Sequence, residues 1–500
     1  MGIIAKQSFW GTVVTYLGTF VGFLTTFFVL TRFLTAEEIG LARVLIDTSV
    51  LFIGLAQLGT SSSLIRFYPY FKDTEEKDHG FFFWMLAVPF AGFILFAIIY
   101  CALHVPISHL FEEKSQLFVD YYYFVLPLAF FLLYQTVVET GCNVLMRIVF
   151  PKAVRELITR LLILTVYLLY AFRVLSMDGF VIALCAVYGI AALLNIVYIF
   201  AVGKISIRPD FKYLDKSLVK QYLWYTFFLI FSAITTVLAP SLSSFFITAQ
   251  LGLNYTGIFA IATYMAVMVS IPTRSLSAIA QPQLASAIKE KNTKESNHLQ
   301  QQVGNNLLLV GLLILAAIWI NIDLIFEILP NGETYASAKQ SVLILGCSQL
   351  IVSTCTIATS ALSYSPYYYL SLVFSAILTV VSIWLNNLLI PLYGMEGAAA
   401  ANLAAYGIYY ALLVSVLKAC TKTSPISRNW LKSLALGVWL FGGNSLLLRF
   451  VPIGNIWGSS IVRSVVLLGI GCLIAYYWNI SPDLNQAVRQ TAERILKRKR

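Results

Sequence analysis

Hydrophobic residues along this chain gather in blocks of about twenty, and short connections between the blocks hold most of the charged residues. A block of this length fits a helix that crosses the hydrocarbon core of a membrane, where every backbone polar group must be satisfied within the segment. The pattern predicts an all-α integral membrane protein with about 14 transmembrane helices. The predicted spans cover residues 9–31, 43–65, 81–103, 117–139, 154–175, 179–202, 222–247, 253–275, 303–326, 339–361, 368–390, 397–418, 430–450 and 460–479.

Composition agrees with this class, because 59% of the 500 residues are hydrophobic and only 11% are charged. Most of the 34 Lys and Arg residues fall in alternate connections, on the side that also holds both chain ends. Lys and Arg are retained on the cytoplasmic side, so we expect a multi-pass protein of the bacterial inner membrane with cytoplasmic N- and C-termini. The cations that fall on the outer side are Arg32, Arg43, Lys114, Arg173, Lys339, Arg449 and Arg463.

The same bias accounts for most of the net charge of +11, so no nucleic-acid partner is needed. Anionic lipids are the expected partners of the basic cytoplasmic loops. In the tail, residues 480–500, apolar side chains recur at helical spacing among basic ones. This predicts a basic amphipathic helix on lipid headgroups, and a solvated tail that only fixes topology fits equally well.

Two stretches of the chain repeat an earlier pattern at a nearly constant spacing. Residues 177–190 match residues 395–408 in their Met-acid-Gly and Tyr-Gly-Ile positions, and Leu34 with Gly40 matches Leu251 with Gly257. Spans one to six therefore repeat as spans seven to twelve. Six is even, so the halves have the same orientation and are predicted to form two parallel six-helix lobes around a central cavity.

Two further helices follow the second lobe. The predicted organisation is an N-terminal lobe at 1–202, a cytoplasmic interlobe linker at 203–221 and a C-terminal lobe at 222–418, followed by two additional helices at 419–479 and the tail. Parallel repeats favour a transporter, because two similar bundles can open a central cavity to one side at a time.

Ionisable residues near the spans are the first candidates for a site, because a charge at bilayer depth usually faces a cavity or a partner. Arg274 follows Pro272 in the inner part of the eighth span, and Pro240 interrupts the polar seventh span. The two prolines are candidate hinges, and Arg274 is the leading candidate for binding an anionic substrate. Arg66 and Arg32 are weaker companions, and both also fit long side chains that reach the headgroups.

Two carboxylates, Asp47 and Glu139, are too short to reach far from their spans. We predict a cavity role or a coupling-ion role for them, with H⁺ or Na⁺ as the candidate ion. For Asp47 a local ion pair with Arg43, four residues earlier on the same helix, is the competing interpretation.

Amides within the spans, among them Asn305 and Asn387, could bind sugar hydroxyls or bond across helices, and both interpretations stay open. The four histidines do not cluster, and no cysteine pair has C-x-x-C spacing, so we expect no metal site and no cofactor. Catalytic residues are not predicted either, because the outer connections are short.

Several motifs resemble those of a known family. Residues 387–399 (NLLIPLYGMEGAA) are similar to the N-x-L-I-P-x-[YF]-G-x-x-G-A-A signature of Wzx-type oligosaccharide flippases, members of the multidrug/oligosaccharidyl-lipid/polysaccharide exporter superfamily. Residues 31–40 (TRFLTAEEIG) resemble that family's R-x-L-x-x-x-[ED]-x-G, and residues 270–274 (SIPTR) look like its eighth span. The chain departs from the family late in the seventh span, where Ser243 and Ser244 stand in place of a frequent Asp.

The resemblance implies a flippase that moves a polyprenyl-pyrophosphate-linked oligosaccharide from the cytoplasmic to the periplasmic leaflet. Its product would serve O-antigen, capsule or exopolysaccharide biosynthesis, and polymerases or glycosyltransferases of that machinery would be its partners. The alternatives are a cation-coupled multidrug or other lipid-linked precursor exporter of the same superfamily and, less favoured, a membrane polymerase or ligase. A cation-coupled exporter would need acidic residues deep in a lobe, and a polymerase or ligase would need a large periplasmic loop to hold its catalytic groups.

Overall fold

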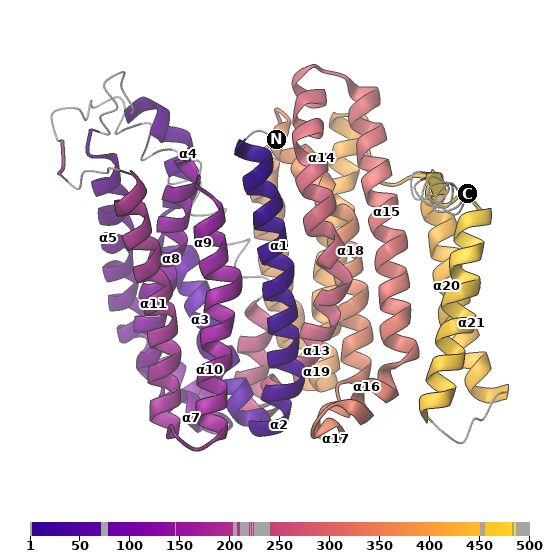
Figure 1. The fold of residues 1–500 in the computed structure, drawn as a ribbon, viewed down its shortest axis with the longest axis horizontal. Coiled ribbons are helices and arrows are strands. Elements are labelled where there is room, and N and C mark those ends of the chain that lie inside the picture. The colour runs from indigo at the N-terminus through magenta and orange to yellow at the C-terminus, as the bar shows by residue number, and fades with distance from the viewer. Residues whose placement is uncertain are drawn as a thin grey trace, which may run out of the picture. The chain divides into compact units, whose positions relative to one another are not determined.

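The computed structural model describes residues 3–71, 79–145, 147–203, 208–210, 220, 222, 224, 241–450, 456–482 and 485–486. Every regular element in this part of the chain is helical. The chain divides into two compact units, Met1–Ala260 and Ile261–Arg500. In each unit the long helices run side by side (Figure 1).

The first unit contains the helices up to α11 and the start of α13. They are α1 (Ile3–Leu24), π-helix η1 (Thr25–Leu30), α2 (Thr31–Phe33), α3 (Ala36–Ala56), α4 (Thr60–Phe71), α5 (Phe81–Ala102), α6 (His104–Phe111), α7 (Gln116–Asp120), 3₁₀-helix η2 (Tyr122–Phe124), α8 (Val125–Val144), α9 (Val149–Ala153), π-helix η3 (Val154–Ile158), α10 (Thr159–Ala171) and α11 (Met177–Gly203). Residues 241–250 form a further helical segment of this unit.

The rest of α13, from Ile261 on, and all later helices lie in the second unit. They are α13 (Leu253–Val267), 3₁₀-helix η4 (Met268–Ser270), α14 (Ile271–Lys289), α15 (Thr293–Ile320), α16 (Ile322–Ile328), α17 (Gly332–Ala336), α18 (Lys339–Tyr364), α19 (Leu370–Cys420), α20 (Arg428–Phe450) and α21 (Ile456–Tyr477).

Ten helices in the described ranges are long and apolar enough to cross a membrane. The all-helical membrane fold predicted from the hydrophobic blocks is therefore confirmed. Of the predicted seventh span, the segment 225–240 lies outside the described residues, and so does the tail from residue 487 onward.

Two predicted spans, 368–390 and 397–418, lie within the single assigned element α19. Its backbone breaks at Gly394, where φ is +59° and ψ is −135°, a conformation that side chains with a Cβ rarely adopt. The first glycine of the NLLIPLYGMEGAA motif, Gly394, is thus the turn at which one span ends and the next begins.

The motif at residues 31–40 is a helix start. The Thr35 hydroxyl accepts a hydrogen bond from the Glu38 amide, and the Glu38 carboxylate accepts one from the Thr35 amide. This reciprocal capping box satisfies two amides at the N-terminus of α3 that have no partner within the helix. The other Glu38 carboxylate oxygen accepts a hydrogen bond from the Tyr170 hydroxyl of α10, which ties the motif to the bundle.

The eighth predicted span, 253–275, is interrupted in its second half. Helix α13 ends at Val267, a 3₁₀ turn follows, and α14 begins with Pro272 in its first turn. Proline suits this position because an amide there has no helical partner. The structure therefore has a helix junction at Pro272, and its use as a hinge stays a prediction.

Two glycines that correspond in the sequence repeat meet in the first unit. A Cβ on Gly40 of α3 would lie 2.0 Å from the carbonyl oxygen of Leu253, and a Cβ on Gly257 of α13 would lie 1.8 Å from that of Ala36. Each would also lie 3.0 Å from the amide nitrogen of the other glycine. Since each helix start contacts the other through equivalent positions, the contact is reciprocal, as in an interface with twofold symmetry.

In the second unit a buried arginine joins the last two helices. Arg463 of α21 donates hydrogen bonds to the Asn444 side chain of α20, to the Ser460 hydroxyl and to the Ser459 carbonyl. Only 5% of Arg463 is exposed, so these bonds replace the water that its guanidinium would otherwise need.

Candidate functional site

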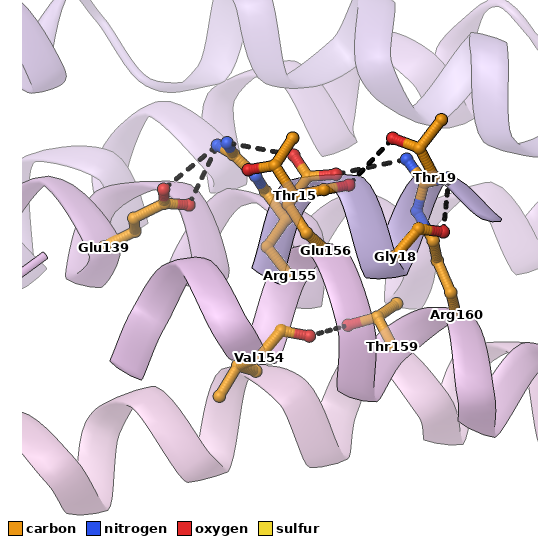
Figure 2. A network of polar contacts seen from close by, with 9 residues as sticks. All are labelled: Thr15, Gly18, Thr19, Glu139, Val154, Arg155, Glu156, Thr159 and Arg160. Atoms are coloured by element: carbon orange, nitrogen blue, oxygen red, sulfur yellow. Dashed lines mark hydrogen bonds and ion pairs between the residues drawn. The ribbon is translucent and has the colours of Figure 1, made fainter. Parts of the chain in front are cut away.

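A network of charged side chains lies among the helices of the first unit (Figure 2). Arg155 of η3 reaches the carboxylate of Glu139 on α8, with Nη1 3.0 Å from Oε1 and 3.1 Å from Oε2. Because one guanidinium nitrogen meets both oxygens, the pair is held in one orientation.

The network continues from Arg155 to helix α1. Arg155 Nη2 lies 3.3 Å from Glu156 Oε1, and Arg160 Nη2 lies 3.1 Å from Glu156 Oε2. Arg160 Nη1 then donates to the Gly18 carbonyl at 3.1 Å. A Cβ on Gly18 would lie 1.9 Å from the Glu156 carbonyl oxygen, so the absence of a side chain lets α1 approach η3. The network therefore links α8, η3, α10 and α1.

The local backbone explains how these side chains converge. Residues Val154–Ile158 form one turn of π-helix, a wide turn that occurs often at functional sites. The Thr159 hydroxyl donates to the Val154 carbonyl at 2.8 Å, five residues back, and so supports that turn (Figure 2). The extra residue changes the register, and Arg155 and Arg160 reach opposite oxygens of Glu156.

The charges in this network balance, since it contains two carboxylates and two guanidinium groups. The Glu139 and Glu156 side chains are each 12% exposed, whereas the Arg155 side chain is 50% exposed. Burying one unpaired charge would be costly, so the pairs make the carboxylates tolerable at this depth. Arg155 is the most exposed member of this network.

The other predicted acid is also paired. Asp47 is buried on α3, and its Oδ2 accepts a hydrogen bond from Arg43 Nε at 2.7 Å. The local pair given as the competing interpretation is therefore present.

The predicted anion-binding cations are divided between the units. Arg274 is exposed on α14 of the second unit, in the turn that begins with Pro272. In the first unit Arg32 is exposed on α2, with its guanidinium carbon 5.5 Å from the Phe33 ring centre. Arg66 lies on α4, and its side chain falls outside the described residues.

The two predicted amides differ in their surroundings. Asn305 of α15 is buried and donates from Nδ2 to the Ile480 carbonyl at 2.5 Å, while its Oδ1 has no protein partner among the described residues. Asn387 of α19 is exposed. Pro240, the other predicted hinge, lies outside the described residues.

Sequence reasoning missed Arg155 and Glu156 as members of a site. A signal was present, because Glu156 and Arg160 stand four residues apart on one predicted span and Arg155 adjoins them. The contact with Glu139 could not be seen, since it joins residues of two different helices.

Comparison with known proteins identifies a family for this chain. The family described as polysaccharide biosynthesis protein matches residues 4–282. Among curated proteins, none matches the chain significantly in sequence.

Solved structures share the fold. A lipid II flippase MurJ in an inward closed conformation matches with a TM-score of 0.72 at 12% identity, over 94% of this chain and 99% of that chain. An inward-facing multidrug resistance MATE family transporter of the MOP superfamily matches with a TM-score of 0.62 at 15% identity, over 82% of this chain and 96% of that chain. A mutant of the Vibrio cholerae MATE transporter VcmN matches with a TM-score of 0.56 at 17% identity, over 83% and 97%. The three solved structures are a flippase and two transporters, and at 12–17% identity the likeness to them is one of fold.

Proposed function

The chain belongs to the polysaccharide biosynthesis protein family, and from that premise we propose that it is a flippase for polyprenyl-pyrophosphate-linked oligosaccharide repeat units. It moves them from the cytoplasmic to the periplasmic leaflet of a bacterial inner membrane by alternating access, for O-antigen, capsule or exopolysaccharide biosynthesis. The observation that carries the proposal is the family match together with a fold shared over nearly the whole chain with a lipid II flippase.

The physical task explains the need for such a protein. Sugars and a pyrophosphate cannot cross hydrocarbon unaided, because their hydrogen bonds and charges to water would be lost. A polar cavity within a helical bundle supplies substitutes for water, while a polyprenyl tail stays in lipid. Pyrophosphate is anionic and is bound most strongly by cationic side chains. The cations proposed to bind it are Arg274, Arg66 and Arg32.

The paired acids bear on the choice between cargo classes. Asp47 and Glu139 are each neutralised by an arginine, so a coupling role for either one requires that its pair first opens. This favours the flippase over a cation-coupled multidrug exporter of the same superfamily. Any coupling ion, H⁺ or Na⁺, would enter through these pairs.

The test is deletion of the gene followed by analysis of lipid-linked intermediates. We expect a polyprenyl-pyrophosphate-linked oligosaccharide to accumulate on the cytoplasmic face, and a plasmid copy to restore surface polysaccharide. Unchanged intermediates, together with a new sensitivity to small toxic cations, would support the multidrug exporter instead.

A further inference from the structure

A short strap, Phe111–Ser115, runs from the last residue of α6 to the start of α7, in a connection predicted to be periplasmic. It packs on the end of the helical segment 241–250. The Ser115 hydroxyl donates to the Thr248 carbonyl at 2.8 Å, and the Lys114 ammonium donates to the Gln250 carbonyl at 2.5 Å. The Phe111 ring is fully buried and meets the Phe245 ring edge-on, with 5.0 Å between ring centres.

These hydrogen bonds satisfy backbone carbonyls at the C-terminal end of the helical segment 241–250. The last four carbonyls of a helix have no partner within it, and a cation suits the negative end of the helix dipole. Leu251 and Gly252 donate to the Ile247 carbonyl, so the strap provides for the Thr248 and Gln250 carbonyls that follow. The strap therefore caps a helix that is remote from it in sequence.

The turn that follows the helix end is fixed to the same place. Gly252 has a φ of +104°, and a Cβ there would lie 2.8 Å from the Lys114 carbonyl oxygen. The Thr248 and Thr256 hydroxyls lie 2.8 Å apart across the turn. One turn later Gly257 meets Gly40.

The helix end that the strap caps belongs to the second half of the sequence repeat. Residues 241–250 are the outer end of the predicted seventh span, with which the second half of the repeat begins, yet they pack in the first unit, whose boundary falls at Ala260 within α13. In the predicted two-lobe transporter the cavity would open between the two halves, so a contact that ties the start of the second half to the first unit bears on that opening.

We propose that the strap Phe111–Ser115 is a releasable latch, which holds the outer end of the seventh span against the first unit and lets go when cargo leaves toward the periplasm. The inference rests on the proposed function. Release is feasible because Lys114 is exposed, so water can replace it at the Gln250 carbonyl. The described polar contacts between the strap and this helix end are two hydrogen bonds to backbone carbonyls.

The first experiment locks the latch. In an active cysteine-free background, Lys114→Cys and Gln250→Cys are combined and joined by a short bis-methanethiosulfonate. We expect loss of glycan export in vivo and its recovery when reductant cleaves the link. As a matched control, Glu112→Cys with Gln116→Cys joins two exposed positions of the same connection without bridging to residue 250, and export should persist. Normal export by the fully linked 114–250 protein would show that export does not require the strap to open and would overturn the proposal.

The second experiment opens the latch and needs no glycan. Thr248 is fully buried, so a Thr248→Cys thiol should react slowly with a membrane-impermeant maleimide. Adding Lys114→Ala and Ser115→Ala should raise the rate about 5- to 10-fold, the shift expected for the loss of one or two net hydrogen bonds. Glu113→Ala, an exposed neighbour on the strap, should leave the rate unchanged. Equal rates in both variants would refute the latch, whereas a different cargo in the export assay would refute only the proposed function.

Discussion

Arginines neutralise the carboxylates that lie among the helices of the first unit at Asp47, Glu139 and Glu156. The sequence could predict the first pair, because Arg43 and Asp47 are four residues apart on one helix. It could not predict the second, because Glu139 and Arg155 come from α8 and η3, and their contact depends on helix packing and on a π-turn. The sequence could therefore predict which types of residue form the candidate site, but only some of the ion pairs between them.

Removing the Glu139 charge tests the network. Glu139→Gln keeps the shape of the side chain but leaves Arg155 with Glu156 as its only acidic partner among the described residues, so we expect a loss of about 1–3 kcal/mol in stability. The measurement is thermal unfolding of the purified protein in detergent, with the exposed Glu113→Gln as the control. In a double-mutant cycle Arg155→Gln should cost less when Glu139 is already Gln, and strictly additive losses would mean that the pair contributes nothing.

Arg274 is the residue on which the proposed substrate site depends most. If its charge holds pyrophosphate, Arg274→Ala should abolish glycan export at normal protein level, and Arg274→Lys should keep part of it, because a point charge still attracts phosphate without bidentate geometry. Surface polysaccharide measured beside immunoblots of the protein gives the answer.

A control for Arg274 lies in the same predicted cytoplasmic stretch. Lys291→Ala removes an exposed cation beyond α14 and should be tolerated. Full export by Arg274→Ala would leave that arginine as a topology anchor only.

At the scale of elements, the helix boundaries follow from capping and turn chemistry that the sequence already contains. Thr35 with Glu38 starts α3, and Pro272 stands in the first turn of α14. Both could be predicted as helix boundaries. The π-turns η1 and η3 could not, because one extra residue in a helix leaves no distinct mark on hydrophobic periodicity.

The break at Gly394 predicts a sharp contrast within α19. Gly394→Ala should cost about 1–3 kcal/mol, because its φ and ψ are adopted almost only by glycine. Gly407→Ala, later in the same element, should cost nothing, since a Cβ there meets no atom within 4 Å. Thermal unfolding of the two variants side by side makes the comparison, and equal melting temperatures would contradict the assigned role of Gly394.

At the scale of the whole molecule, the hydrophobic blocks predicted the helical membrane class, and the family match supports the flippase resemblance. The contact between the strap and residues 241–250 could not be predicted from the sequence. Its partners are backbone carbonyls at the end of a remote helix, and every helix end has such carbonyls. The charge bias along the chain gave the orientation, which remains a prediction.

Orientation is tested by thiol labelling from outside the cell. Single cysteines in place of Leu110 or Glu333 should react with an impermeant maleimide, because both positions lie in predicted periplasmic connections. Cysteines in place of Glu75, Lys212, Asn292 or Pro425 should react only after the membrane is opened. Labelling of position 212 in intact cells would contradict two parallel six-helix halves.

The reciprocal contact of Gly40 and Gly257 also bears on how such a chain could arise. In a dimer of identical six-span proteins, the same contact would be one glycine meeting its own copy, so a single codon would determine both sides. Duplication and fusion of such a gene would make the two sides separate codons that could change independently. That freedom allows the residues around the contact to differ, as Ala36 and Leu253 now do, while the two glycines still pack backbone to backbone.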